Sequence, residues 1–259
     1  MRLLKAELLK ISYQRAMWGL LLAAVLFSAL GTGASAFAID RFSEDLAGGT
    51  LSETPYVDAV YANAVSGYIF AMLVGVLIVA GEFHHGTAVA TFIAVPKRSR
   101  VLLAKMVAAG IAGLVLQGVA AAMGFLGGYL ALLAYPDAAS PSIDIFINTS
   151  LASLVSGVVL GILGAAIGAL VRSQVLALVG VLLWLFAIEP IVIVLLPEIA
   201  NYSLTGLITG IISLDLQTEA LNVDFGAYLP PFTATLFLFG YAVVFALVAL
   251  ISSMRRDID

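Results

Sequence analysis

Side chains that commonly carry out chemistry are scarce in this chain of 259 residues. It contains no cysteine, which excludes disulfides, thiolate zinc sites, iron–sulfur clusters and cysteine nucleophiles. The two histidines are the adjacent residues His84 and His85, which point about 100° apart on a helix and have no other histidine or cysteine to complete a metal site. No further histidine could activate a serine. We therefore predict no metal site and no catalytic residue here, and expect the two histidines to cap a helix or contact a partner.

The two histidines lie in the most unusual stretch of the sequence, GEFHHGTAVATFIAVPKRSRVLLAK, residues 81–105. Within it, Val89, Phe92 and Ile93 recur at helical spacing. A basic cluster follows, formed by Lys97, Arg98, Arg100 and Lys105. A short apolar helix outside a membrane needs a partner to cover it. The partner could be other parts of the chain, an acidic lipid headgroup layer or a cytosolic subunit that docks on the loop.

The elements that hold this stretch must be membrane helices, because 62% of the residues are hydrophobic and only 11% are charged. A helix needs roughly 20 apolar residues to cross a bilayer. Six stretches meet that length, at residues 16–39, 61–81, 106–135, 146–171, 175–196 and 232–253. We therefore predict an all-α integral membrane protein with one transmembrane domain over 1–259 and no soluble domain.

The distribution of basic residues predicts the orientation of these six spans. Lysine and arginine near span ends are retained on the cytoplasmic side. If the N-terminus is inside, eleven of the twelve lysines and arginines are cytoplasmic and only Arg41 is outside. We therefore expect both ends of the chain in the cytoplasm. The first span could instead be a signal peptide, but its apolar stretch exceeds the usual length of about 7–15 residues, so we expect an uncleaved anchor.

Two flanking segments are expected to lie on opposite sides of the membrane. Residues 1–15 place Leu4, Leu8 and Ile11 on one helical stripe, which predicts an amphipathic helix along the inner interface, leading into the first span. Residues 197–231 form an external segment before the last span. Its apolar part, 203–214, is too short to cross the bilayer. It is either a re-entrant or interfacial pair of helices or an ordinary loop that packs on the bundle.

Glycines recur four or fewer residues apart in two of the predicted spans. They are Gly124 and Gly128 in the third, and Gly157, Gly161, Gly164 and Gly168 in the fourth. Small residues at this spacing let membrane helices approach closely. The spacing favours packing within the bundle over a specific dimer face.

Several residues of the stretch 82–105 resemble the pattern of glutamate, glycine–threonine, proline, arginine and lysine in type-2 ATP-binding-cassette permeases. They are Glu82, Gly86, Thr87, Pro96, Arg98 or Arg100, and Lys105. The length, the six spans, the amphipathic start and the external segment also resemble that family. Two departures are the residues Phe83, His84 and His85, where many relatives have a basic residue after the glutamate, and an external segment that is less obviously helical.

In that family the loop is the coupling helix, so the resemblance implies which residues dock an ATPase subunit. They are Glu82, Phe83, His84, His85, Gly86, Thr87, Val89, Phe92 and Ile93. We therefore predict that replacing Phe92 or Glu82 uncouples ATP hydrolysis from transport and leaves the protein folded and inserted, because the loop lies outside the bilayer core.

The resemblance also implies the partners: two copies of a separate ATPase, which bind ATP and magnesium, and a second permease, either an identical copy or a paralogue. This chain has no phosphate-binding loop of the Gly-x-x-x-x-Gly-Lys-Ser/Thr type, so we expect no enzyme activity and no cofactor in it. We expect no nucleic-acid partner, and a place in the bacterial cytoplasmic membrane, surrounded by lipid. Export is implied by the family alone.

A substrate cavity between two copies would be lined mainly by apolar residues of the second and fifth spans. The few polar or amphipathic candidates are Asn63, Ser66, Tyr68, Trp184 and Glu189. Such a wall suits lipids, amphipathic peptides or hydrophobic drugs. Glu189, directly before Pro190, could bind substrate or a proton, or it could mark a kink with a hydrated acid. A secondary transporter or channel without an ATPase is the alternative, although such proteins usually carry more ionisable residues within their spans.

Overall fold

The computed structural model describes residues 2–46, 50–87, 93, 95, 97–213 and 228–255. Every regular element in these ranges is a helix. They are α1 (Arg2–Tyr13), α2 (Arg15–Leu46), α3 (Thr54–Ala62), the 3-10 helix η1 (Asn63–Gly67), α4 (Tyr68–His84), α6 (Arg98–Leu132), α7 (Ile143–Val171), α8 (Gln174–Leu183), the π-helix η2 (Trp184–Ile188), α9 (Glu189–Leu195), α10 (Pro197–Ala200), α11 (Leu204–Ile212) and α12 (Pro231–Arg255).

Six helical stretches among the described residues are long and apolar enough to cross a membrane. They are Arg15–Phe42, Thr54–His84, Arg98–Leu132, Ile143–Val171, Gln174–Leu195 and Pro231–Ser252. Each overlaps one of the stretches predicted from the sequence. The prediction of an all-α, multi-pass membrane protein is therefore confirmed.

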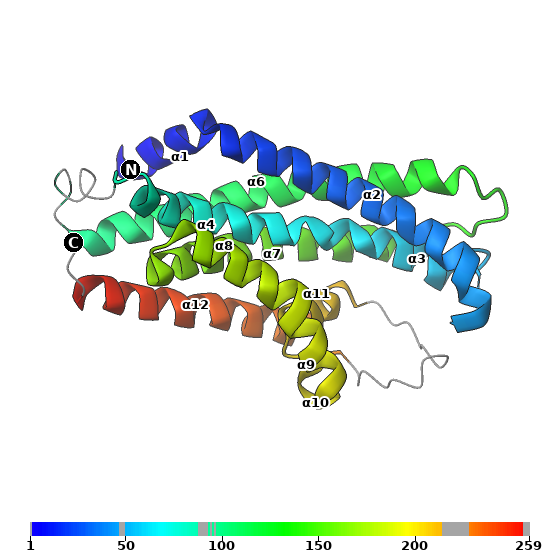
Figure 1. The fold of residues 1–259 in the computed structure, drawn as a ribbon. Coiled ribbons are helices and arrows are strands. Elements are labelled where there is room, and N and C mark those ends of the chain that lie inside the picture. Colours follow the sequence, from blue (N-terminus) through cyan, green and yellow to red (C-terminus); the bar gives the residue numbers. More distant parts are fainter. Residues whose placement is uncertain are drawn as a thin grey trace.

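The long helices lie side by side, so that the start of α1 and the last turn of α12 lie at the same end of the bundle (Figure 1). The end of α4 and the start of α6 also lie there, whereas α3 lies at the opposite end (Figure 1). Ten of the eleven lysines and arginines in the described ranges belong to this end, and only Arg41 belongs to the other. We call it the basic end.

Helices α4, α6 and α7 form the centre of the bundle, and glycines allow their close contact. A Cβ atom at Gly164 of α7 would lie 2.0 Å from the carbonyl oxygen of Met72 in α4. A Cβ atom at Gly113 of α6 would lie 2.1 Å from the carbonyl oxygen of Gly157. The glycines of α7 therefore pack within the bundle, as their spacing predicted.

The second span is not one continuous α-helix, which its sequence did not reveal. It changes from α3 to α4 through the 3-10 turn η1. Side chains of neighbouring helices bind carbonyl groups of that turn: the hydroxyl of Ser28 donates to the oxygen of Ala64 at 3.0 Å, and the amide of Gln117 donates to that of Val65 at 2.6 Å. Such bonds compensate for irregular backbone where no water is available.

The fifth span is also interrupted, by the π-helix η2 directly before Glu189 and Pro190. Proline has no backbone N–H, so the helix cannot keep its regular hydrogen bonds there. Beyond it, α10 and α11 cover much of the first half of the external segment, and α11 packs its buried residues against α7 and α12. Residues 204–212 are thus helical and pack on the bundle, while residues 214–227 lie outside the described ranges.

Candidate functional site

The end of α4 shows why glycine and threonine follow the histidines. Gly86 has a φ of 67°, a left-handed conformation that glycine adopts without steric cost. The N–H of Thr87 donates to the carbonyl of Glu82 at 3.0 Å, and the N–H of Gly86 donates to that of Phe83 at 3.4 Å. This pair of bonds is a Schellman motif, which ends a helix sharply. Gly86 and Thr87 therefore end the second span and start the loop.

Helix α1 packs against α6 and joins α2 through a turn at Gln14. Leu4, Leu8 and Ile11 are half-buried on the bundle side, whereas Lys5 is exposed, so α1 has an apolar and a polar face. A carboxylate also lies on the bundle side, because Glu7 is buried. A buried carboxylate needs compensating charge or hydrogen bonds.

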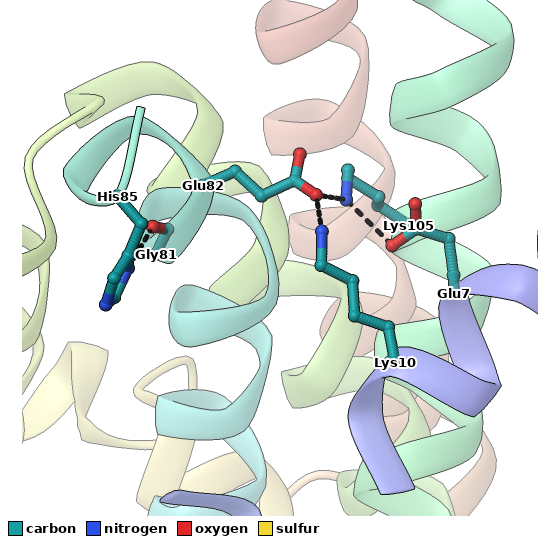
Figure 2. Close-up of polar contacts among 6 residues, drawn as sticks. All are labelled: Glu7, Lys10, Gly81, Glu82, His85 and Lys105. Atoms are coloured by element: carbon teal, nitrogen blue, oxygen red, sulfur yellow. Dashed lines mark hydrogen bonds and ion pairs between the residues drawn. The ribbon is translucent and has the colours of Figure 1, made fainter. Parts of the chain in front are cut away.

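Four charged side chains meet where α1, α4 and α6 come together (Figure 2). The ammonium of Lys105 donates to Glu7 Oε2 at 2.7 Å and lies 2.8 Å from Glu82 Oε1. The ammonium of Lys10 donates to the same oxygen of Glu82. We call Glu7, Lys10, Glu82 and Lys105 the basic-end cluster.

The basic-end cluster carries two positive and two negative charges, and most of it is shielded from solvent. Glu82 is 6% exposed and Lys105 3%, and Glu7 is equally buried. Removing one partner of a buried ion pair leaves an uncompensated charge, which costs roughly 3–5 kcal/mol. The cluster therefore holds α1 firmly to the two helices that flank the loop.

This geometry changes the expectation for Glu82. Its carboxylate is not available at the surface, because it faces Lys10 and Lys105. These buried ion pairs predict that replacing Glu82 destabilises the fold, in contrast to the expectation from the sequence. Glu82 therefore links the end of α4 to α1 and α6.

Some of the other predicted docking residues contact the rest of the chain, whereas another is exposed. Phe83 stacks under the guanidinium of Arg172, 5.6 Å from its ring centroid, and the rings of His84 and His85 lie edge to face, 5.0 Å apart. His85 Nδ1 lies 2.7 Å from the carbonyl oxygen of Gly81, so His85 interacts with the end of its own helix. Ile93 is 77% exposed. Val89 and Phe92 lie outside the described residues.

A cavity of about 390 Å³ opens beside the basic-end cluster, between α1 and α4. Its apolar wall includes Ile11, Leu77 and Ile78. Its polar lining includes Glu7, Lys10, Tyr13, Gln14, Glu82 and His85. The cavity is thus lined by both apolar and hydrogen-bonding side chains.

No family model matches this chain, and a search of the curated proteins finds no match. Its function is inferred from the residues and their geometry.

The residues predicted for a substrate cavity are only partly brought together. Glu189 is 2% exposed, and its Oε1 accepts a hydrogen bond of 2.7 Å from the N–H of Thr205. The hydroxyl of Tyr68 lies 3.3 Å from that of Thr205. Glu189 therefore directly follows a helix interruption, and its carboxyl group is buried.

The remaining three candidates lie elsewhere. Asn63 and Ser66 belong to the 3-10 turn η1, where the amide of Asn63 donates to the carbonyl of Ala59 at 3.0 Å. Trp184 lines a second cavity of about 490 Å³, together with Tyr202 and Tyr241. These residues do not form a common site with Glu189 in a single chain.

Sequence reasoning missed Glu7 and Gln117. The sequence does indicate that Glu7 is unusual, since it lies on the same helical face of α1 as the apolar residues Leu4, Leu8 and Ile11. Gln117 is an amide in the middle of an apolar span and is fully buried. Its partner, the carbonyl of Val65, could not be identified without the 3-10 turn that exposes it.

Proposed function

We propose that this chain is the permease subunit of an ATP-driven ATP-binding-cassette exporter. The observation that carries the proposal is the basic-end cluster. Glu82 and Lys105, two of the residues that carry the family resemblance, lie at the two ends of the loop and are joined there to the amphipathic helix α1. A separate ATPase that docks on the loop would thereby act on three helices together.

The central position of α4 and α6 supports this role. Both helices begin or end at the loop and pack against α7 through the bundle. A displacement of the loop is transmitted along a packed helix because protein interiors deform little. The buried charges of the cluster keep α1 aligned with both helices during such a movement.

The proposal includes the partners that the resemblance implies. Two ATPase subunits bind ATP and magnesium, a second permease completes the pathway, and the basic end faces the cytoplasm of a bacterial cell. The cargo is a hydrophobic or amphipathic molecule, such as a lipid, a peptide or a drug. The charge asymmetry of the bundle supports the orientation.

Affinity purification of the chain from its native host in mild detergent, followed by mass spectrometry, tests the proposal. We expect a soluble protein with a phosphate-binding loop to co-purify in stoichiometric amount. Recovery of the chain alone, also after crosslinking, would contradict the ATP-driven function.

Ile93 offers a sharper test of the docking surface once the ATPase is in hand. Ile93→Ser removes an apolar side chain that is 77% exposed in the loop, and we expect it to weaken ATPase binding about tenfold, as loss of an interface anchor typically does. Ile143→Ser is the matched control, because Ile143 is 75% exposed at the opposite end of the bundle. Equal ATPase affinity in the two variants would exclude Ile93 from the interface.

A secondary transporter is the second candidate, and the surroundings of Glu189 favour it. Transporters of that kind often bind ions or substrates where a span is interrupted and a helix terminus meets it. Here Glu189 follows the π-helix η2 and bonds to the first turn of α11, and its Oε2 is buried without a hydrogen-bond partner. If no ATPase co-purifies, Glu189→Gln in a transport assay becomes the decisive variant.

A further inference from the structure

The cavity between α1 and α4 lies at the ends of two of the candidate membrane spans. Tyr13 lines it from the end of α1 and Gln14 from the turn before the first span, and Gly81 and His85 line it from the end of the second. Tyr13 is 80% exposed, and the exposed Trp18 follows on α2. Exposed tyrosine and tryptophan side chains are typical of the headgroup level of a membrane. The cavity therefore opens where lipid headgroups lie.

The polar side chains that line this cavity carry more hydrogen-bond donors than the ion pairs of the basic-end cluster use. Lys10 has three N–H donors, one of which binds Glu82, and its side chain is 49% exposed. The Tyr13 hydroxyl and the Gln14 amide add further donors. The carboxylates of Glu7 and Glu82 are compensated by the lysines of the basic-end cluster. The charges of the basic-end cluster thus cancel, and the donors of Lys10, Tyr13 and Gln14 remain for an oxygen ligand such as a phosphate group.

The apolar wall and the surrounding charge specify the ligand further. Ile11, Leu77 and Ile78 give one side of the cavity an apolar surface. The basic end carries ten of the eleven described lysines and arginines, so its charge complements an anionic membrane surface. A volume of about 390 Å³ falls within the range of small-molecule sites, roughly 300–1,000 Å³.

We propose that the cavity between α1 and α4 binds one anionic phospholipid, with its phosphate on Lys10, Tyr13 and Gln14 and part of an acyl chain along Ile11, Leu77 and Ile78. The lipid fills the gap beside the basic-end cluster and supports the position of α1. This site requires only that α1 lies at a membrane surface. It is therefore independent of the ATPase, and the co-purification experiment above does not decide it.

The test is native mass spectrometry of the full, delipidated chain in an equimolar mixture of phosphatidylglycerol and phosphatidylcholine with the same acyl chains. We expect the first bound lipid to be phosphatidylglycerol. One basic residue near a membrane surface contributes about 1 kcal/mol, so Lys10→Gln should lower phosphatidylglycerol binding about fivefold. Lys10→Arg keeps the charge and should retain binding. Inorganic phosphate in large excess should not displace the lipid, because it lacks the acyl chain.

Lys5→Gln is the matched control, since Lys5 lies on the same helix, carries the same charge and does not line the cavity. It should leave the lipid preference nearly unchanged. Tyr13→Phe alters a side chain that is mostly exposed, so it tests the site even if Lys10→Gln impairs folding, and it should lower phosphatidylglycerol binding. Equal binding of the two lipids, equal losses in the two lysine variants, or full binding by Tyr13→Phe would each overturn the proposal.

Discussion

At the scale of single residues, Lys105 is the centre of the basic-end cluster. A lysine ammonium carries three donors, and here two of them reach carboxylates on two different helices, Glu7 on α1 and Glu82 on α4. Because Lys105 is 3% exposed, water cannot replace either partner. Its side chain therefore joins α1, α4 and α6 at one point.

Replacing Lys105 by methionine should destabilise the protein by roughly 3–5 kcal/mol, because Glu7 is then left buried without a cation. The measurement is the midpoint of thermal unfolding in detergent. Adding Glu7→Gln to Lys105→Met should recover part of the loss, since Glu82 keeps Lys10 as its partner. Lys5→Met is the control, because Lys5 is exposed. If Lys105→Met and Lys5→Met unfold at the same temperature, the cluster does not stabilise the fold.

At the scale of elements, α7 shows how glycine determines which helices meet. Gly157 and Gly161 face α6, where their Cβ atoms would lie 2.7 Å from the carbonyl oxygen of Gly113 and 2.4 Å from that of Ala109. Gly164 and Gly168 face α4 instead, against the carbonyl oxygens of Met72 and Val76. The same helix therefore contacts two neighbours through two pairs of glycines.

A methyl group at Gly164 has no space, because its Cβ would lie 2.0 Å from the carbonyl oxygen of Met72, a backbone atom. We expect Gly164→Ala to cost about 1–3 kcal/mol of unfolding free energy through overpacking, measured as a lower thermal midpoint. Gly180→Ala is the matched control, since no heavy atom lies within 4 Å of a Cβ there. Alanine is also the better helix former, so this control should be neutral or slightly stabilising. Equal loss in both variants would contradict the close approach of α4 and α7.

The interruptions of the second and fifth spans belong to the same scale. At η1, carbonyl groups are bound by Ser28 and Gln117 from other helices. The π-helix η2 directly precedes Glu189 and Pro190, and the N–H of Thr205 donates to the Glu189 carboxylate. Each interruption thus leaves polar groups among apolar helices, and at least one of these groups has a hydrogen-bond partner on another part of the chain.

At the scale of the whole molecule, the two ends of the bundle differ in charge. The basic end holds the start of α1, the end of α4, the start of α6 and the last turn of α12 (Figure 1). Because positive residues near spans are retained in the cytoplasm, this end should be the cytoplasmic one.

Single cysteines test this orientation without background, because the chain has none of its own. Lys97→Cys lies at the basic end and Asp137→Cys at the opposite end, and both positions are exposed. In intact cells, a membrane-impermeant maleimide should label only the Asp137→Cys variant. The Lys97→Cys variant should react only after lysis. The reverse pattern would mean that the bundle is inserted the other way round.

The sequence by itself determined the fold class, the number and approximate limits of the six spans, and the packing role of the glycines. These properties depend on composition and on local periodicity, because lipid accepts only long apolar helices with their backbone bonds satisfied. The sequence also identified Glu82 and Lys105 as residues of interest, through the resemblance of their loop to a known family.

The tertiary structure alone decided what those residues contact. Glu82 meets Lys10 across 72 positions of the chain, and Lys105 meets Glu7 across 98. No local pattern encodes such pairs, because they depend on how α1 folds back on the bundle. The same holds for Glu189, whose burial depends on α11 packing beside it, and for the 3-10 turn, whose carbonyl groups are bound by residues of other helices. Apolar burial specified the spans, whereas the partners of the few buried charges depend on helices that are distant in sequence and adjacent in space.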